Sequence, residues 1–165
     1  ILFPFAVVAE AAVPAAPAAA VPRTSREAAP RGGNELILLV DDEPALRRAG
    51  KRLLERKGYR VEVASDGAEA LDTYLAREGE IALIVSDVVM PRMSGPELLT
   101  ELRRRGKSPL ILFTSGYTAR DSAQARRLGP ASLFIPKPWN NAKFLAAVRE
   151  ALDLAPTAAT PGSSS

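Results

Sequence analysis

Residues 81–95 read IALIVSDVVMPRMSG, and this stretch decides the fold. Its first six residues, Ile81 to Ser86, form an apolar run of the length typical of a buried strand, and Asp87 follows directly. Pro91 and Gly95 indicate a tight loop that can turn a backbone carbonyl toward the end of that strand. The stretch therefore predicts a buried strand with a carboxylate at its carboxyl end and a shaped loop beside it.

Outward from this stretch, short apolar runs alternate with longer amphipathic ones between Glu35 and Asp153, which is typical of repeated βα units around a parallel sheet. The five predicted strands are Leu36 to Val40, Arg60 to Ala64, Ile81 to Ser86, Leu110 to Phe113 and Ser132 to Ile135. The five predicted helices are Pro44 to Arg56, Asp66 (as N-cap) to Arg77, Pro96 to Arg105, Thr118 to Leu128 and Asn140 to Leu152. The predicted fold class is α/β, with a doubly wound parallel sheet.

The two ends of the chain differ in composition from this central part. Ala and Pro dominate residues 6–30, where prolines recur too often for a helix to run through, and we interpret residues 1–33 as a linker. Residues 155–165 read as a flexible polar tail. The apolar opening is too short and too rich in proline for a membrane span, and no basic residue precedes Arg23, unlike in a signal peptide. Because residue 1 is not Met, we expect a piece of a longer protein. We also expect this segment to be cytoplasmic and to contain no membrane span.

The composition excludes several kinds of chemistry. The 165 residues contain neither cysteine nor histidine, which rules out disulfides, zinc sites built on those residues, iron–sulfur clusters and Ser-His-Asp or Cys-His catalysis. The formal net charge of +3 is too small to indicate nucleic-acid binding. No Gly-rich nucleotide-binding loop follows a predicted strand. The chemistry of this chain must use carboxylates, hydroxyls, lysine and arginine.

Polar side chains follow the predicted strands, whose carboxyl ends meet at one edge of a doubly wound sheet. They are Asp41 and Asp42 after the first strand, Asp87 after the third, Thr114 after the fourth and Lys137 after the fifth. Three carboxylates in one crevice repel each other unless a cation lies among them, and Mg²⁺ prefers oxygen ligands of this kind. A lysine and a hydroxyl nearby suit further anionic oxygens. The set predicts a magnesium-assisted phosphoryl site in which Asp87 is the accepting nucleophile.

Four motifs occur in register with these strand ends: VDDEP (40–44), SDVVMPRMSG (86–95), FTSGY (113–117) and FIPKPW (134–139). In order and spacing they resemble the receiver domain of two-component response regulators. The resemblance implies a flavodoxin-like (βα)5 fold with strand order 2-1-3-4-5 and a receiver domain over residues 34–154. It also implies that a phosphohistidine donor phosphorylates Asp87 and that the receiver promotes only its own phosphorylation and dephosphorylation.

The resemblance assigns the metal ligands as well. Asp42, Asp87 and the backbone carbonyl of Val89 would bind Mg²⁺, or Mn²⁺, directly, and Asp41 would bind it through water. Val89 and Gly116 stand at the two positions where side chains can orient or block the attacking water in the family. Valine is aliphatic and glycine has no side chain, so neither residue can form a side-chain hydrogen bond with water. We therefore predict slow loss of the phosphoryl group.

Further roles are implied for residues after the fourth strand. Thr114 would close onto the phosphoryl oxygens, Lys137 would form an ion pair with them, and Phe134 would be the aromatic switch residue that turns inward when Thr114 moves. The Lys137–Pro138 bond is cis in the family. Trp139 departs modestly from the pattern because the family usually has Phe at this position.

The resemblance leaves the parent protein open. The partner would be a histidine kinase domain or a histidine phosphotransfer protein, with no direct contact to nucleic acid. The opening ILFP (1–4) and the linker resemble the last strand of a kinase ATP-binding domain running into an attached receiver, so we favour the C-terminal receiver of a hybrid sensor histidine kinase, whose parent could be membrane-anchored. The alternatives are a stand-alone regulator, a phosphate-independent interaction module and a phosphatase. A phosphate-independent interaction module would be expected to lack Asp42, Asp87 or Lys137, all of which are present. A phosphatase of this kind generally needs a second aspartate near the nucleophile, whereas two valines follow Asp87.

Overall fold

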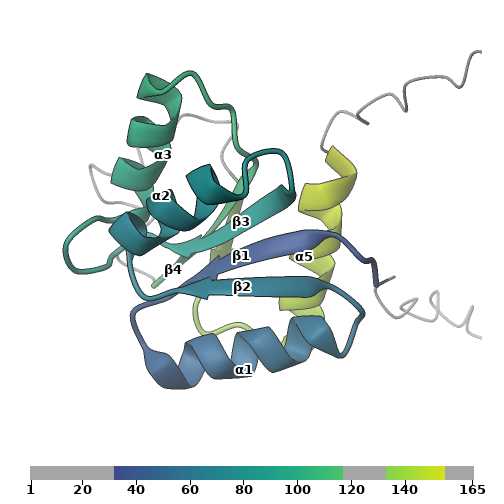
Figure 1. The fold of residues 1–165 in the computed structure, drawn as a ribbon. Coiled ribbons are helices and arrows are strands. Elements are labelled where there is room, and N and C mark those ends of the chain that lie inside the picture. The colour runs from purple at the N-terminus through teal and green to yellow at the C-terminus, as the bar shows by residue number, and fades with distance from the viewer. Residues whose placement is uncertain (1–31, 117–132, 155–165) are drawn as a thin grey trace, which may run out of the picture.

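The computed structural model describes residues 32–116 and 133–154, which form a parallel sheet with helices on both of its faces (Figure 1). The strands are β1 (Leu36–Val40), β2 (Arg60–Ala64), β3 (Ile81–Asp87), β4 (Ile111–Ser115) and β5 (Leu133–Pro136). The helices are α1 (Pro44–Glu55), α2 (Gly67–Ala76), α3 (Gly95–Arg104) and α5 (Asn141–Leu154). The strand order is β2-β1-β3-β4-β5 with all pairs parallel, which confirms the predicted fold class and strand order.

Three strands extend beyond their predicted carboxyl ends: β3 to Asp87, β4 to Ser115 and β5 to Pro136; β4 also begins one residue later than predicted, at Ile111. Asp87 is the last residue of β3 rather than the first residue after it, and it pairs with Thr114, which lies inside β4. The predicted strands ended where the apolar runs end, whereas the backbone ladder continues through polar residues because its hydrogen bonds do not depend on side-chain polarity. The predicted helix Thr118 to Leu128, the linker before residue 32 and the tail after residue 154 lie outside the described residues.

The sheet separates two layers of apolar side chains. Alternate residues of β1 point to opposite faces, as a strand requires, so that Leu38 and Val40 lie in one layer and Ile37 and Leu39 in the other. The first layer packs under α2 and α3, and the second packs against α1 and α5 (Figure 1). All five residues of β1 are buried, which explains why its sequence is a continuous apolar run rather than an alternating one.

Gly95 begins α3 where the helix lies against the end of β3. A Cβ at this position would lie 2.4 Å from the Asp87 carbonyl oxygen, 2.9 Å from Ser86 Oγ and 3.0 Å from Phe113 Cε1. Since backbone atoms cannot move aside cheaply, we expect Gly95→Ala to lower the free energy of unfolding by about 2 kcal/mol or more, as overpacking does. Urea unfolding measures this. Gly116→Ala is the control, because none of the described atoms lies within 4 Å of a Cβ built there; equal losses in the two variants would contradict the explanation.

Candidate functional site

Three carboxylates meet at the carboxyl edge of the sheet. One oxygen each from Asp41, Asp42 and Asp87 lies within 4.8 Å of the other two. Asp41 directly follows β1 and is buried, Asp42 is exposed, and Asp87 ends β3. Turn backbone holds two of them: the Glu43 amide donates to Asp41 Oδ1 at 2.9 Å, and the Val89 amide donates to Asp87 Oδ1 at 3.2 Å. The predicted cluster therefore forms, with each of its members supplied by the end of a strand.

Lys137 reaches this cluster from the loop between β5 and α5. Its Nζ donates to Asp87 Oδ2 at 2.6 Å and to Asp41 Oδ2 at 3.1 Å. Burial alone would lower the pKa of Lys137, but the hydrogen bond with Asp87 and the charges of Asp87 and Asp41 outweigh it, so the net pKa is raised above the usual value. Lys137 is therefore positively charged at neutral pH. Its amide donates to the Ser115 carbonyl at 2.7 Å, and the Lys137–Pro138 peptide bond is cis.

Thr114 and Phe134 lie beside the cluster on neighbouring strands. Thr114 is buried directly across from Asp87 in the ladder, and its carbonyl accepts a hydrogen bond from the Val88 amide at 3.0 Å. Phe134 is partly buried in the layer under α2 and α3, where its ring centroid lies 5.5 Å from that of Phe113. The structure thus places a hydroxyl residue next to Asp87 and an aromatic residue at the same edge of the sheet.

The donor set fits a hard divalent cation. Three carboxylates stand against one lysine, so the cluster keeps an uncompensated negative charge, and all of its donor atoms are oxygens. Mg²⁺ prefers oxygen ligands and commonly uses one or two carboxylates while keeping several waters. The exposed position of Asp42 and Val89 leaves solvent access to the cluster, as a hydrated ion requires.

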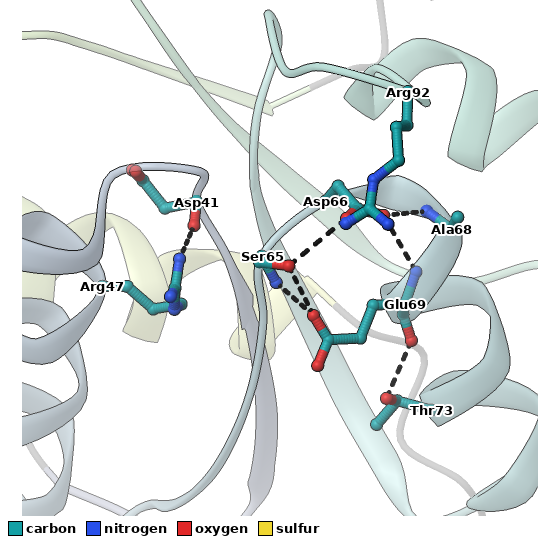
Figure 2. A network of polar contacts seen from close by, with 8 residues as sticks. All are labelled: Asp41, Arg47, Ser65, Asp66, Ala68, Glu69, Thr73 and Arg92. Carbon is teal, nitrogen blue, oxygen red and sulfur yellow. Dashed lines mark hydrogen bonds and ion pairs between the residues drawn. The ribbon is translucent and has the colours of Figure 1, made fainter.

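The loop from residue 88 to residue 94 contains a contact that sequence reasoning missed. Figure 2 shows Arg92 directed at Asp66, the buried N-cap of α2, with which it forms an ion pair. The sequence predicts Asp66 only as a helix cap and indicates no role for Arg92. The two residues are far apart in the chain and neither type is unusual in a turn, so no signal in the sequence joined them.

A recess lies on the other side of Lys137. It has a volume of about 320 Å³ and is lined by Leu46 of α1 and by Lys137, Pro138 and Trp139. The indole ring of Trp139 stacks on Phe144 with ring centroids 4.3 Å apart. Trp139 therefore packs the β5–α5 loop against α5.

A doubly wound parallel sheet with an acidic cluster and a lysine at its carboxyl edge defines a flavodoxin-like phosphoacceptor domain. The chain belongs to the response regulator receiver domain family, whose model matches residues 37–149. It is 41% identical over 141 residues to the sensor kinase CckA of Brucella abortus, covering 84% of this chain and 15% of the kinase. It is 38% identical over 116 residues to the transcriptional regulatory protein CpxR of Escherichia coli, covering 70% of this chain and 48% of CpxR.

The fold comparison agrees with this assignment. The response regulator TrrA of Thermotoga maritima, solved in complex with Mg²⁺ and BeF, is 29% identical and has a TM-score of 0.61, covering 71% of this chain and 98% of TrrA. The chain therefore spans less than half of CpxR and a small part of CckA, but nearly the whole of a solved receiver. Within residues 32–116 and 133–154, none of the helices has the length and apolar character needed to cross a bilayer.

Proposed function

We propose that this chain accepts a phosphoryl group on Asp87 from a phosphohistidine of a histidine kinase domain or a histidine phosphotransfer protein. A carboxylate oxygen of Asp87 forms the new bond to phosphorus, the bond from phosphorus to the donor imidazole nitrogen breaks, and the imidazole leaves with the electron pair. The observation that carries the proposal is the position of Lys137 Nζ, 2.6 Å from Asp87 Oδ2 within the acidic cluster. This lysine supplies a fixed positive charge for the incoming phosphoryl oxygens.

The metal partner of this reaction is Mg²⁺, or Mn²⁺. Asp42, Asp87 and the Val89 carbonyl would hold the ion directly, and Asp41 would contact it through water. When bound, it neutralises the charge of the phosphoryl oxygens. The turn amides already orient Asp41 and Asp87, so little reorganisation of these two carboxylates is needed at the time of transfer.

The phosphoryl group would act as a switch. We propose that Thr114 closes onto the phosphoryl oxygens and that Phe134 turns inward as it does so, which changes the surface around β4 and β5. Two facts support this: Thr114 is buried next to Asp87, and Phe134 packs on Phe113, the residue that precedes Thr114. The output is then a shape change offered to a partner protein.

We propose that the parent protein is a hybrid sensor histidine kinase, with a linker over residues 1–33, the receiver over residues 34–154, a tail over residues 155–165, and a cytoplasmic location. The match to the CckA kinase supports this, because it extends over 141 residues where the match to CpxR extends over 116. A stand-alone regulator is the second candidate. The gene sequence before residue 1 separates them: the hybrid requires nucleotide-binding motifs there, and the stand-alone regulator lacks them.

The test of the proposed function is the intact mass of the chain after incubation with a small acyl phosphate. We expect one added phosphoryl group with Mg²⁺ and none with a chelator in its place. No added mass under either condition, together with none from a phosphorylated histidine donor, would favour the phosphate-independent interaction module.

The lifetime of the phosphorylated form is expected to be long. Val89 is 62% exposed beside Asp87, and its aliphatic side chain offers no hydrogen bond to a water molecule at the phosphoryl group. We expect Val89→Asn, whose amide can orient such a water, to shorten the half-life by roughly tenfold. The decay of intact-mass signal with time measures it. Val89→Leu is the matched control and should leave the half-life unchanged; a similar shortening in both variants would contradict the role given to the side chain.

A further inference from the structure

An ion pair joins the loop between β3 and α3 to the turn before α2 (Figure 2). Arg92 Nη2 contacts Asp66 Oδ2; the Asp66 side chain is fully buried, whereas that of Arg92 is 68% exposed. We propose that this pair, the Arg92–Asp66 latch, positions the loop so that the Val89 carbonyl faces the acidic cluster. The inference rests on the proposed function and deepens it by assigning two positioning residues to the metal site.

The backbone at Arg92 shows that the loop is held in an uncommon conformation. Its φ angle is +64°, a region that non-glycine residues seldom occupy and that persists where surrounding contacts enforce it. Val89 lies three residues earlier in the same loop. A change of backbone conformation at Arg92 would therefore move the peptide units between Pro91 and Val89, including the carbonyl that the proposed function assigns to the metal.

Other contacts also hold the loop: the Val88 and Met90 side chains are buried in the layer under α2 and α3. Gly95 N donates to the Val88 carbonyl at 3.3 Å, which closes the two ends of the loop on each other. Gly67 N donates to the Met93 carbonyl at 3.0 Å, and a Cβ at Gly67 would lie 2.6 Å from that oxygen, so turn and loop are in close contact there. Among the described residues, this amide bond, the Gly67–Met93 packing and the latch join the loop to the turn.

Asp66 has two separable tasks. Its Oδ1 accepts the amides of Ala68 and Glu69 at 2.8 and 3.0 Å as the N-cap of α2, while its Oδ2 contacts Arg92 and accepts a longer hydrogen bond from Ser65 Oγ at 3.3 Å. Asparagine caps helices as well as aspartate does, because its side-chain oxygen can accept the same amides. Asp66→Asn therefore keeps the cap and replaces the oxygen facing Arg92 with an amino group, which cannot accept from a guanidinium. This variant breaks the latch without unfolding the start of the helix.

The experiment measures two quantities on the full chain without phosphoryl donor: the Mg²⁺ dissociation constant by calorimetry, and the exchange rate of the Gly67 amide in the metal-free protein. We expect Asp66→Asn and Arg92→Ala each to weaken Mg²⁺ binding by roughly tenfold, at the lower end of what loss of supporting contacts around metal sites costs. We also expect faster exchange of the Gly67 amide in both variants. Arg92→Lys, which keeps the positive charge, should recover most of the affinity.

The double variant and a matched control sharpen the result. If the two residues act through one contact, Asp66→Asn combined with Arg92→Ala should bind Mg²⁺ about as well as the weaker single variant. Arg104→Ala removes an equally exposed arginine that pairs with Glu101 on α3, and it should leave both quantities unchanged. Fully additive losses in the double variant would contradict a shared role.

The outcomes separate the latch from the function on which it rests. If the wild-type chain takes up Mg²⁺ and phosphoryl while both single variants bind Mg²⁺ within about twofold of it, the latch is wrong and the proposed function stands. If the wild-type chain binds no Mg²⁺ and gains no phosphoryl group, the proposed function fails, and the latch fails with it because there is no metal site to position.

Discussion

Asp87→Asn should abolish the magnesium-dependent gain of a phosphoryl group completely. Asparagine keeps the shape of the side chain and can still accept from the Val89 amide, but its amide is not a nucleophile for phosphorus. The variant therefore separates loss of chemistry from loss of fold. Intact mass after incubation with acyl phosphate and Mg²⁺ measures the effect, and a phosphoryl gain equal to that of the wild-type chain would place the acceptor elsewhere.

Two further carboxylate variants make this result specific. Asp42→Asn removes a carboxylate that the proposed function assigns to the metal while leaving the acceptor in place, so phosphorylation should slow and need more Mg²⁺. Asp72→Asn changes an exposed carboxylate on α2 outside the acidic cluster and should behave as wild type. A loss in Asp72→Asn as large as that in Asp87→Asn would indicate a general effect of charge rather than a defined acceptor.

Lys137→Met should change metal binding and phosphoryl transfer in opposite directions. Lys137 Nζ contacts Asp87 Oδ2 and Asp41 Oδ2 and so competes with a cation for the same oxygens. Methionine has a similar length but no charge, so we expect Mg²⁺ to bind about tenfold more tightly once this competition is removed. The rate of phosphorylation should fall by roughly 100- to 1,000-fold, because a fixed donor for the transferred phosphoryl oxygens is gone.

Calorimetry with Mg²⁺ and the time course of phosphoryl gain measure the two effects on the same preparation. Lys143→Met is the control: this lysine lies on the exposed side of α5, and both quantities should stay at the wild-type values. A Lys137→Met variant that loses Mg²⁺ affinity along with the phosphorylation rate would show that Lys137 orients the carboxylates rather than competing with the metal.

Most of the fold could be predicted because its signals are local. Each buried strand is a short apolar run, and the N-cap at Asp66 and the proline at position 44 mark helix starts directly in the sequence. The parallel topology follows from the βα alternation. The strand order came from the resemblance, because apolar runs carry no information on which strands pair.

Only part of the site could be predicted from the sequence. The proximity of the carboxylates and Lys137 could be predicted from the sequence, because the carboxyl ends of the strands share one edge of a parallel sheet. The Arg92–Asp66 contact could not, since it depends on the path of two loops and on a positive φ at a residue that usually avoids it. The extension of β3 through Asp87 could not be predicted either, because strand pairing uses backbone groups and is independent of side-chain polarity.

The two apolar layers have a consequence for how such a domain can change over generations. The Phe113–Phe134 pair and the side chains of Val88, Met90 and Met93 belong to the layer under α2 and α3, and none of them belongs to the layer against α1 and α5. The backbone of the sheet stands between the layers, so substitutions in one reach the other only through that backbone. Mutation and selection can therefore repack α1 or α5 for a new partner while the residues proposed to switch keep their own packing.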